Sequence, residues 1–314
     1  MIPLHRVASL FYNRPLLITP QRAQMISAFL VGRIEGRSGA AAFGEQPIEE
    51  VQAFASTQNR DGSVSFHSPR ASRFVGEYSK DEVSGKPRPY RMTGDGIAII
   101  TMIGELVNRG AWMDSMSGMI SYEGFTAQLQ MAENDSKVKA VVMDMESPGG
   151  EAIGAMEASA QVRKTASVKP VIAFGNGMAA SAMYALASGA TARVGIPSSE
   201  WGSIGVVLMH LDMSGALQQA GLRPTFIFAG ARKVDGNPYE ALPKDVQSRL
   251  QTMVNKFYGS FVSTVAQGTG LSEDAIRATE AELFTADDAK SLGLIDEIGT
   301  LDDVLGMIRS ARAA

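Results

Sequence analysis

The chain has 314 residues, 45% of them hydrophobic, and a formal net charge of −4 at pH 7. This content can build a sizeable core, and the charge gives no reason to expect a nucleic-acid-binding surface. The absence of cysteine excludes disulfides, thiol catalysis and thiolate metal sites. No apolar run is long enough to span a bilayer and no secretory signal opens the chain, so we expect a soluble cytoplasmic protein without a membrane partner.

Composition divides the chain into three regions. Residues 1–40 contain one predicted helix, Pro20–Ile34, with Thr19 as its N-cap. Residues 41–92 are poor in aliphatic residues and rich in Gly, Ser, Arg and Pro, which predicts a flexible linker. Residues 93–314 alternate strand and helix patterns, which predicts an α/β domain with a largely parallel sheet. In such folds, ligands usually bind at the carboxyl ends of the strands.

The third region contains six predicted strands and six predicted helices. The strands are Gly96–Leu106, Val138–Met145, Val171–Phe174, Ala192–Ile196, Ile204–His210 and Thr225–Phe228. The helices are Tyr122–Asn134, Glu151–Val168, Ala179–Ala187, Ser214–Ala220, Pro243–Gln267 and Leu301–Arg312.

Ser181 lies where a predicted strand gives way to a predicted helix. Val171–Phe174 is a short apolar run, and Gly175–Gly177 is expected to end it before an alanine-rich helix begins. A serine at the start of that helix lies beside unpaired backbone N–H groups at the positive end of the helix dipole. A nucleophile needs such surroundings when negative charge develops next to it. The alternative is a serine that only caps the helix.

Gly149 and Gly150 follow another predicted strand. They come directly after Pro148, between the strand Val138–Met145 and the next predicted helix. Glycine leaves its backbone N–H open to approach, so this segment is a candidate oxyanion hole together with the N–H of Ala182, which follows the candidate nucleophile. The alternative is an ordinary strand-to-helix turn, which Pro-Gly-Gly also suits.

Lys233 is the candidate general base. It comes just beyond the predicted strand Thr225–Phe228, among glycine and apolar residues. An ordinary lysine is charged at neutral pH and cannot take a proton from serine, but desolvation by the fold or by a neighbouring subunit disfavours the charged form. The alternative is a solvated loop lysine.

Histidine and metal chemistry are less favoured than a serine–lysine pair. The three histidines are His5, His67 and His210, and the first two lie in the N-terminal region. A Ser-His-Asp arrangement would need His210, with Asp212 or Asp144 to orient it, but a histidine after an apolar strand is more simply structural. No cluster of His, Asp and Glu has the spacing of metal ligands, so we expect no metal.

Four short segments that occur in order carry a family resemblance. They are E-S-P-G-G at Glu146–Gly150, N-G-M-A-A-S-A at Asn176–Ala182, G-S-I-G-V at Gly202–Val206 and A-G-A-R-K at Ala229–Lys233. Together they resemble the S49 family of serine peptidases, which includes signal peptide peptidase A and phage head maturation proteases. The opening V-A-S-L-F-Y-N-R-P-L-L-I is similar to that of the lambda type of phage capsid protease, as is the segment that begins at Lys233.

The resemblance implies a ClpP/crotonase-like α/β fold, assembly into a ring of identical subunits, and no cofactor. It implies that Ser181 is the nucleophile and Lys233 the general base, which in this family can come from adjacent subunits. It further implies an oxyanion hole made by Gly149–Gly150 and Ala182, with Ser203 orienting the lysine. The implied substrates are capsid and scaffold proteins, cleaved inside a phage procapsid in the cytoplasm of a bacterial host.

Other functions stay open. A bacterial peptidase that degrades signal-peptide remnants has the same motifs, but the lack of a membrane segment and the phage-like opening disfavour it. A non-proteolytic assembly factor could retain the fold; Ser181 and Lys233 argue against it, although the sequence cannot show that their side chains meet. An enoyl-CoA hydratase-like enzyme shares the fold class but would not need this serine and lysine.

Overall fold

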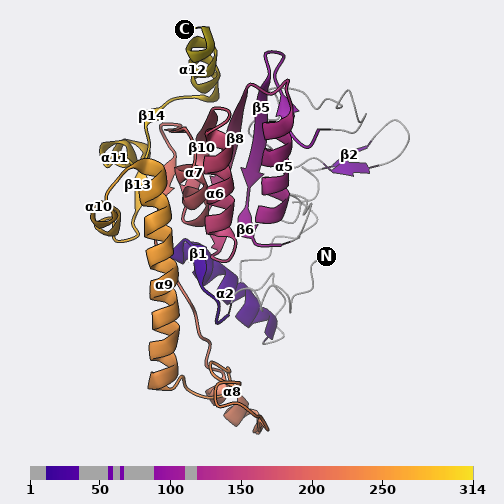
Figure 1. Ribbon diagram of the computed structural model, residues 1–314. Coiled ribbons are helices and arrows are strands. Elements are labelled where there is room, and N and C mark those ends of the chain that lie inside the picture. Colours follow the sequence, from indigo (N-terminus) through magenta and orange to yellow (C-terminus); the bar gives the residue numbers. More distant parts are fainter. Residues whose placement is uncertain (1–11, 35–55, 59–63, 67–87, 110–118, 314) are drawn as a thin grey trace.

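The computed structural model describes residues 12–34, 56–58, 64–66, 88–109 and 119–313 (Figure 1). Its strands are β1 (Leu16–Ile18), β2 (Ser56–Gln58), β3 (Val64–Phe66), β4 (Arg91–Met92), β5 (Ile97–Ile103), β6 (Glu105–Val107), β7 (Met119–Ser121), β8 (Ala140–Ser147), β9 (Gly149–Glu151), β10 (Val171–Ala180), β11 (Ala192–Gly195), β12 (Glu200–Gly202), β13 (Leu283–Thr285) and β14 (Glu297–Ile298). Its helices are α2 (Pro20–Ile34), α5 (Tyr122–Asn134), α6 (Ala155–Ala166), α7 (Ala182–Ser188), α8 (Ser214–Gln219), α9 (Lys244–Thr269), α10 (Glu273–Arg277), α11 (Ala286–Ser291) and α12 (Leu301–Ala313). Most of the expected linker lies outside the described residues, so the division into three regions stays a prediction. His5 and His67 also lie outside the described residues.

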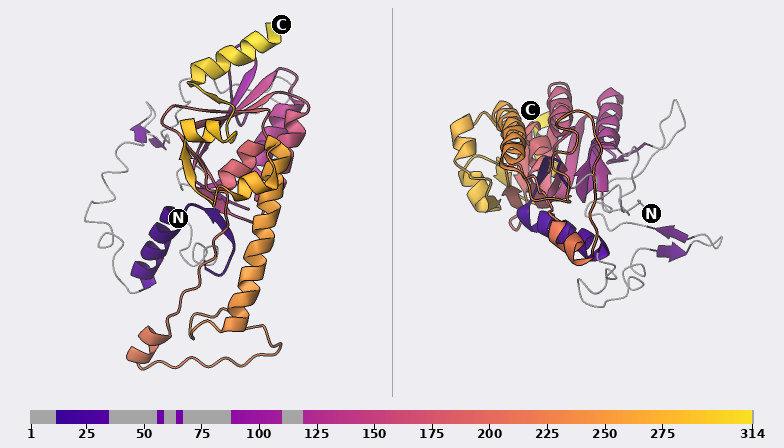
Figure 2. Two further views of the ribbon diagram at one scale, coloured as in Figure 1. Left: turned by 90° about the vertical axis from the view of Figure 1, so that its left-hand side faces the viewer. Right: turned by 90° about the horizontal axis from the view of Figure 1, so that it is seen from below.

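An eight-stranded sheet forms the centre of the molecule (Figures 1 and 2). Its main path runs β13-β12-β10-β8-β5-β4, with β11 paired to β10 and β14 paired to β11. The central pairs β5–β8, β8–β10, β10–β11 and β10–β12 are parallel, and only the edge strands β4 and β13 run antiparallel to their neighbours. The predicted α/β class with a largely parallel sheet is therefore confirmed.

Alternation along the central strands divides their side chains between two cores. In β8, Val141 and Met143 join the core that also holds Phe125 of α5, whereas Val142 packs in a second core with Ile308 of α12. Helices α5, α6, α7 and α9 thus cover one face of the sheet and α12 covers part of the other. Within the described ranges, no helix combines the length and apolar character that crossing a membrane requires.

A second, four-stranded sheet in the order β1-β9-β6-β7 lies at the edge of this body. Strand β6 of this sheet begins where the chain leaves the large sheet at Gly104, whose φ of 115° suits glycine. The predicted strand Gly96–Leu106 is therefore wrong as one element, because β5 and β6 belong to different sheets. Strand β9 pairs antiparallel with β1 and parallel with β6, which puts Gly149 and Gly150 in the middle of the small sheet.

Several predicted elements are confirmed closely because their periodicity is local and regular. Helices α2 and α5 have the predicted bounds, and α8, α9, α12, β8 and β11 begin and end near them. Two predictions around the glycine segments are wrong. The helix predicted from Glu151 begins only at Ala155, since residues 149–151 pair as β9, and Gly175–Gly177 does not end β10, which continues to Ala180 with a shift of register against β8.

Two predicted strands are not formed in the single chain. In Ile204–His210, Val207 and Met209 make only isolated bridges, to Leu16 and Tyr12. Thr225–Phe228 has no strand assignment although its residues favour one, and it lies in the exposed segment between α8 and α9. This segment projects away from the α/β body beside the adjoining half of α9 (Figure 2). We call residues 221–243 the arm.

Candidate active site

Ser181 lies at the sharp turn between β10 and α7. Its φ of 53° and ψ of −115° fall in a region that non-glycine residues rarely adopt. The Ser181 N–H donates to the Gly202 carbonyl at 2.8 Å, and the Ser181 carbonyl accepts from the Ala185 N–H at 3.0 Å. The surrounding structure therefore holds a strained backbone in place, and a strained strand-to-helix turn is typical of nucleophilic serines.

The Ser181 hydroxyl is buried and unpaired. The residue is 0% exposed, and Oγ has no hydrogen-bond partner in the described part of the chain. A buried polar group without a partner costs about 1–3 kcal/mol, so folded proteins keep few of them. Backbone strain and an unsatisfied hydroxyl at one residue single out Ser181 as a candidate reactive group. The alternative of a serine that only caps the helix is not supported, because the Ser181 side chain makes no capping hydrogen bond.

Gly149 lies directly against Ser181. A Cβ built on Gly149 would come within 3.0 Å of Ser181 Cβ and would overlap the carbonyl of Leu17. The φ of 106° at Gly149 also suits glycine. A Cβ on Gly150 would overlap the Leu106 carbonyl, so both predicted glycines are needed for close backbone approach. The Gly149 N–H donates to Ser147 Oγ at 3.1 Å, and Gly150 faces Leu17 across the β1–β9 pair.

Ala182 and Ser203 adjoin the same turn. Ala182 is the first residue of α7, where a backbone N–H has no partner within the helix. Ser203 follows Gly202, whose carbonyl receives the Ser181 N–H, and the Ser203 N–H donates to Glu282 O at 2.7 Å. Ser203 is buried with a φ of 52°. The structure thus brings the main chains of Ser181, Gly149, Ala182 and Ser203 together.

Lys233 is not part of this cluster in the single chain. Its side chain is exposed, it lies on the arm, and no described group hydrogen-bonds to Ser181 Oγ. The turn that carries Lys233 has contacts of its own. Its N–H donates to Gly230 O at 3.0 Å, and Asp235 on the same turn forms an ion pair of 2.6 Å with Arg249 of α9.

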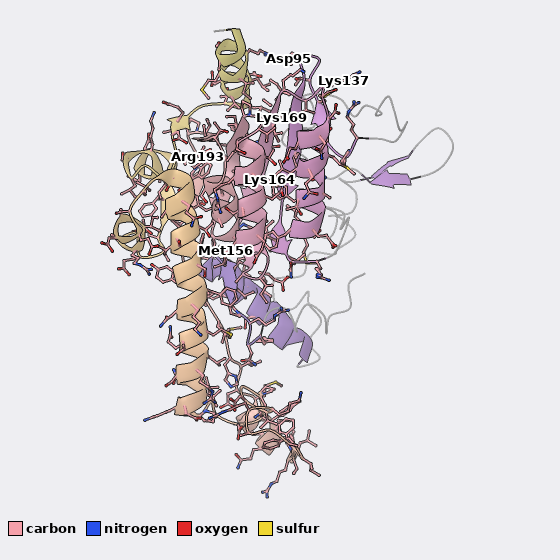
Figure 3. All side chains as sticks on the ribbon, in the orientation of Figure 1. Asp95, Lys137, Met156, Lys164, Lys169 and Arg193 are labelled. Carbon is pink, nitrogen blue, oxygen red and sulfur yellow. The ribbon has the colours of Figure 1, made fainter. Side chains whose placement is uncertain are left out.

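Lys169 and Arg193, two charged residues next to the sheet, make structural contacts. Lys169, whose pKa is lowered by desolvation, donates to the Ala132 and Asp135 carbonyls at 2.9 and 2.7 Å beyond the end of α5 (Figure 3). Arg193 pairs with Asp296 at 2.8 Å. Neither group therefore serves Ser181.

His210 also makes a structural contact. Its Nδ1 lies 3.2 Å from Asn13 Oδ1, and its Nε2 is buried without a partner in the described chain. Because Ser181 Oγ has no partner, the alternative Ser-His-Asp arrangement is not assembled in the single chain. Among the described residues, no group of His, Asp and Glu is arranged to hold a metal ion.

Two buried aromatic side chains pack between the elements that adjoin the Ser181 turn. Tyr184 of α7 donates its hydroxyl to Leu294 O at 2.8 Å and meets the Trp201 ring edge-on at 6.4 Å. The indole N–H of Trp201 in turn donates to Ser199 Oγ at 2.8 Å. Both rings are fully buried, so α7 and β12 are fixed relative to each other on either side of Ser181.

The sequence analysis missed one part of the site. Leu16–Ile18 forms β1 and lies along β9, with the Leu17 carbonyl beside Gly149 and therefore beside Ser181. The apolar triplet after Pro15 is a plausible short strand, but nothing in its sequence indicates which edge it pairs with.

Comparison with known proteins finds a family model and two phage relatives among its matches. Residues 163–313 match the model of peptidase family S49. The chain is 36% identical over 309 residues to the head-tail preconnector protein GP5 of Enterobacteria phage P21, which covers 98% of this chain and 57% of that protein. It is 32% identical over 308 residues to the capsid assembly protease C of Escherichia phage lambda, which covers 98% of this chain and 66% of that protein. The chain therefore spans less than two thirds of the length of these two relatives.

A solved structure shows a weaker likeness. The 1510-N membrane protease of Pyrococcus horikoshii, described as specific for a stomatin homolog, is 16% identical, and the match covers 68% of this chain and 78% of that one with a TM-score of 0.41.

Proposed function

The chain carries a domain of peptidase family S49, and on that premise we propose that it is a serine endopeptidase with Ser181 as nucleophile and Lys233 as general base. The matched segment includes both residues. The observation that carries the proposal is the state of Ser181: a strained turn, a buried hydroxyl without a partner, and Gly149 packed against it. A serine with only a structural role would not be expected to combine a strained backbone with an unsatisfied buried hydroxyl, because both reduce the stability of the fold.

The proposed reaction uses an acyl-enzyme intermediate. Neutral Lys233 takes the proton of Ser181 Oγ as that oxygen attacks the peptide carbonyl. The N–H of Ala182 stabilises the oxyanion together with an N–H of Gly150 or of Gly149, which would first have to release its bond to Ser147 Oγ. Lys233 then gives the proton to the leaving amine and activates the water that releases the acyl group. Ser203, next to Gly202, orients the lysine, and no cofactor or metal is involved.

We further propose that Lys233 reaches Ser181 of a second copy in a ring-like homo-oligomer. Lys233 is exposed to solvent on the arm. The arm also exposes a run of large apolar side chains, with Ile227 fully exposed between Phe226 and Phe228. Such a patch is unusual for a free surface and typical of an interface. Burial of the arm against a neighbour would also desolvate the lysine, which disfavours its charged form.

The substrates we propose are capsid and scaffold proteins, cleaved inside a procapsid in the cytoplasm of a bacterial host. The names of the two phage relatives, a capsid assembly protease and a head-tail preconnector, favour this setting. A signal-peptide-degrading peptidase is the second candidate, since a putative signal peptide peptidase SppA from Enterococcus faecium is 24% identical over 240 residues.

The direct test is cleavage of the candidate substrates. Purified protein is incubated with the major capsid and scaffold proteins of the phage or prophage, and the fragments are identified by mass spectrometry. We expect defined fragments with the wild type and none with Ser181→Ala or Lys233→Ala. Lys256→Ala is the matched control, because Lys256 is another exposed lysine, on α9, and should retain cleavage. Fragments from Ser181→Ala at the wild-type rate would contradict the proposal.

A further inference from the structure

Strand β1 occupies an edge that an extended peptide could otherwise use. It runs antiparallel to β9, with Leu17 opposite Gly150 and Ile18 opposite Gly149. On its other side, Leu16 and Val207 exchange two backbone hydrogen bonds, of 2.8 and 3.0 Å. Three residues of chain thus fill the space between two backbone edges, which is how peptides bind when they add a strand to a sheet.

The position of β1 relative to Ser181 is that of a substrate. The Leu17 carbonyl and Ser181 Cβ both lie within 3.0 Å of the point that a Cβ on Gly149 would take. The Leu17 side chain is 0% exposed and belongs to the main core, whereas Leu16 and Ile18 pack on the opposite side with Ala23 of α2. The Leu17 side chain therefore enters the main core while those of Leu16 and Ile18 face the opposite way, the arrangement expected of a bound strand.

Polar contacts secure β1 at both ends. Arg14 forms an ion pair of 3.3 Å with Glu151, and Arg22 forms one of 2.6 Å with Glu105. Asn13 donates from Nδ2 to Gly236 O at 2.7 Å. Arg14 and Arg22 are 36% and 40% exposed, whereas Glu151 and Glu105 are 8% and 23% exposed, so water reaches the arginine end of each pair and the released cation would be solvated. A three-residue edge strand held in this way is a segment that can leave by local opening.

We infer that Leu16–Ile18 is an internal occupant of the peptide-binding groove, and that a substrate binds in its place. The substrate is an extended peptide that lies antiparallel to Gly149–Glu151, with an aliphatic side chain where Leu17 now lies. Hydrolysis then requires β1 to leave, which keeps Ser181 covered until a substrate competes. This inference rests on the proposed peptidase function, but the occupancy of the groove can be measured without catalysis.

The test locks β1 in place with a disulfide. The chain has no cysteine of its own. Leu16 and Glu151 face each other as a non-hydrogen-bonded pair, flanked by the bond from Ala152 N to Pro15 O. Such pairs have a Cα separation of about 4.5 Å, which a disulfide can bridge. The double variant L16C/E151C, in the Ser181→Ala background, is compared with itself in the oxidised and reduced states.

The readout is binding of a fluorescent peptide that copies residues 14–22. We expect at least tenfold weaker binding to the oxidised protein, and recovery on reduction. Equal affinity in the two states, including no binding in either, would overturn the inference, as would failure of the disulfide to form. The same double variant with Ser181 intact is assayed for cleavage in parallel. If peptide binding depends on the disulfide but no variant cleaves, the peptidase proposal fails while the groove assignment stands.

Self-cleavage is the remaining outcome. N-terminal sequencing of the wild-type protein is expected to find the peptide bonds of Leu16–Ile18 intact. Cleavage within them would overturn the inference, because β1 would then be a substrate rather than an occupant.

Discussion

Ser181 combines two features that each destabilise a fold. Its backbone lies in a left-handed region at φ 53°, and its Oγ is buried with no described partner. Either feature costs about 1–3 kcal/mol in proteins generally. Neighbouring groups maintain the turn through the hydrogen bonds to Gly202 and from Ala185. At the scale of the residue, stability is therefore expected to conflict with function.

This conflict predicts the behaviour of Ser181→Ala. Removal of the unpaired hydroxyl should leave the free energy of unfolding unchanged or raise it by about 1 kcal/mol, while cleavage is lost. Urea denaturation of the wild type and Ser181→Ala measures the difference. Ser181→Gly, which also relieves the strained φ, should be at least as stable as Ser181→Ala. A loss of more than about 1 kcal/mol in Ser181→Ala would mean that the hydroxyl makes a stabilising contact.

Substitution of Gly150, in the small sheet, should lower the stability of the protein, in contrast to Ser181→Ala. A Cβ there would overlap the Leu106 carbonyl and force β9 away from β6, so Gly150→Ala should cost about 3 kcal/mol or more. Gly259→Ala is the matched control, because nothing lies within 4 Å of its added Cβ and alanine favours helix α9, by up to about 1 kcal/mol. Thermal denaturation of both variants measures the contrast. A Gly150→Ala protein as stable as the wild type would contradict the close β6–β9 packing.

At the scale of elements, a buried ion pair joins the approach to β4 to the end of α5. Arg88 Nε lies 2.6 Å from Asp135 Oδ2, and the two side chains are only 5% and 11% exposed. Burial, the largest single influence, would raise the pKa of Asp135, but the hydrogen bonds from Arg88, the Lys137 N–H and Tyr90, together with the charge of Arg88, lower it overall. Stability from this carboxylate is therefore present above the unfolded pKa of about 4 and is lost as the pH falls below it.

Arg88→Met should accordingly destabilise the protein by about 3 kcal/mol at pH 7, because a buried carboxylate loses its charged partner and keeps only the hydrogen bonds from Tyr90 and the Lys137 N–H. The deficit should shrink towards pH 3, because the wild-type protein loses the stability that the lowered pKa of Asp135 provides as the pH falls below the unfolded pKa. Arg309→Met is the control: its pair with Asp95 at 2.7 Å joins exposed groups (Figure 3) and should cost less than about 1 kcal/mol. Urea midpoints at the two pH values provide the comparison, and a deficit independent of pH would contradict the argument.

The elements also show which features a sequence can predict. Helices α2 and α5 have their predicted bounds because their apolar periodicity and their first residues are local signals. Strand β9 was missed because Gly149 and Gly150 are poor strand formers, and only its pairing with β1 and β6 makes it a strand. Tertiary pairing of this kind cannot be inferred from local propensity.

The same limit applies to the site. The motif around Ser181 correctly indicated a strand-to-helix turn, and Gly149 lies against that turn. The oxyanion hole of Gly149, Gly150 and Ala182 stays a prediction. The occupation of the neighbouring edge by Leu17 depends on a long-range contact and had no sequence signal. The assignment of Lys233 as the base stays a prediction, since its proposed partner belongs to another copy of the chain.

At the scale of the whole molecule, the single chain has the features of an incomplete enzyme. One part, the α/β body, holds Ser181 and the glycine amides, and the arm holds Lys233 beside the exposed Ile227. The turn of Lys233 is joined to α9 by the pair between Asp235 and Arg249. An arm with an apolar surface and an exposed amine is suited to complete the site of a neighbour.

The most direct measurement of this account mixes two inactive variants. Ser181→Ala keeps Lys233 and Lys233→Ala keeps Ser181, so each should be inactive alone. After mixing and reassembly in equal amounts, about a quarter of the interfaces should pair an intact serine with an intact lysine, and cleavage should return in that proportion. A mixture that remains inactive although mixed oligomers form, or near-normal cleavage by Lys233→Ala alone, would contradict the account.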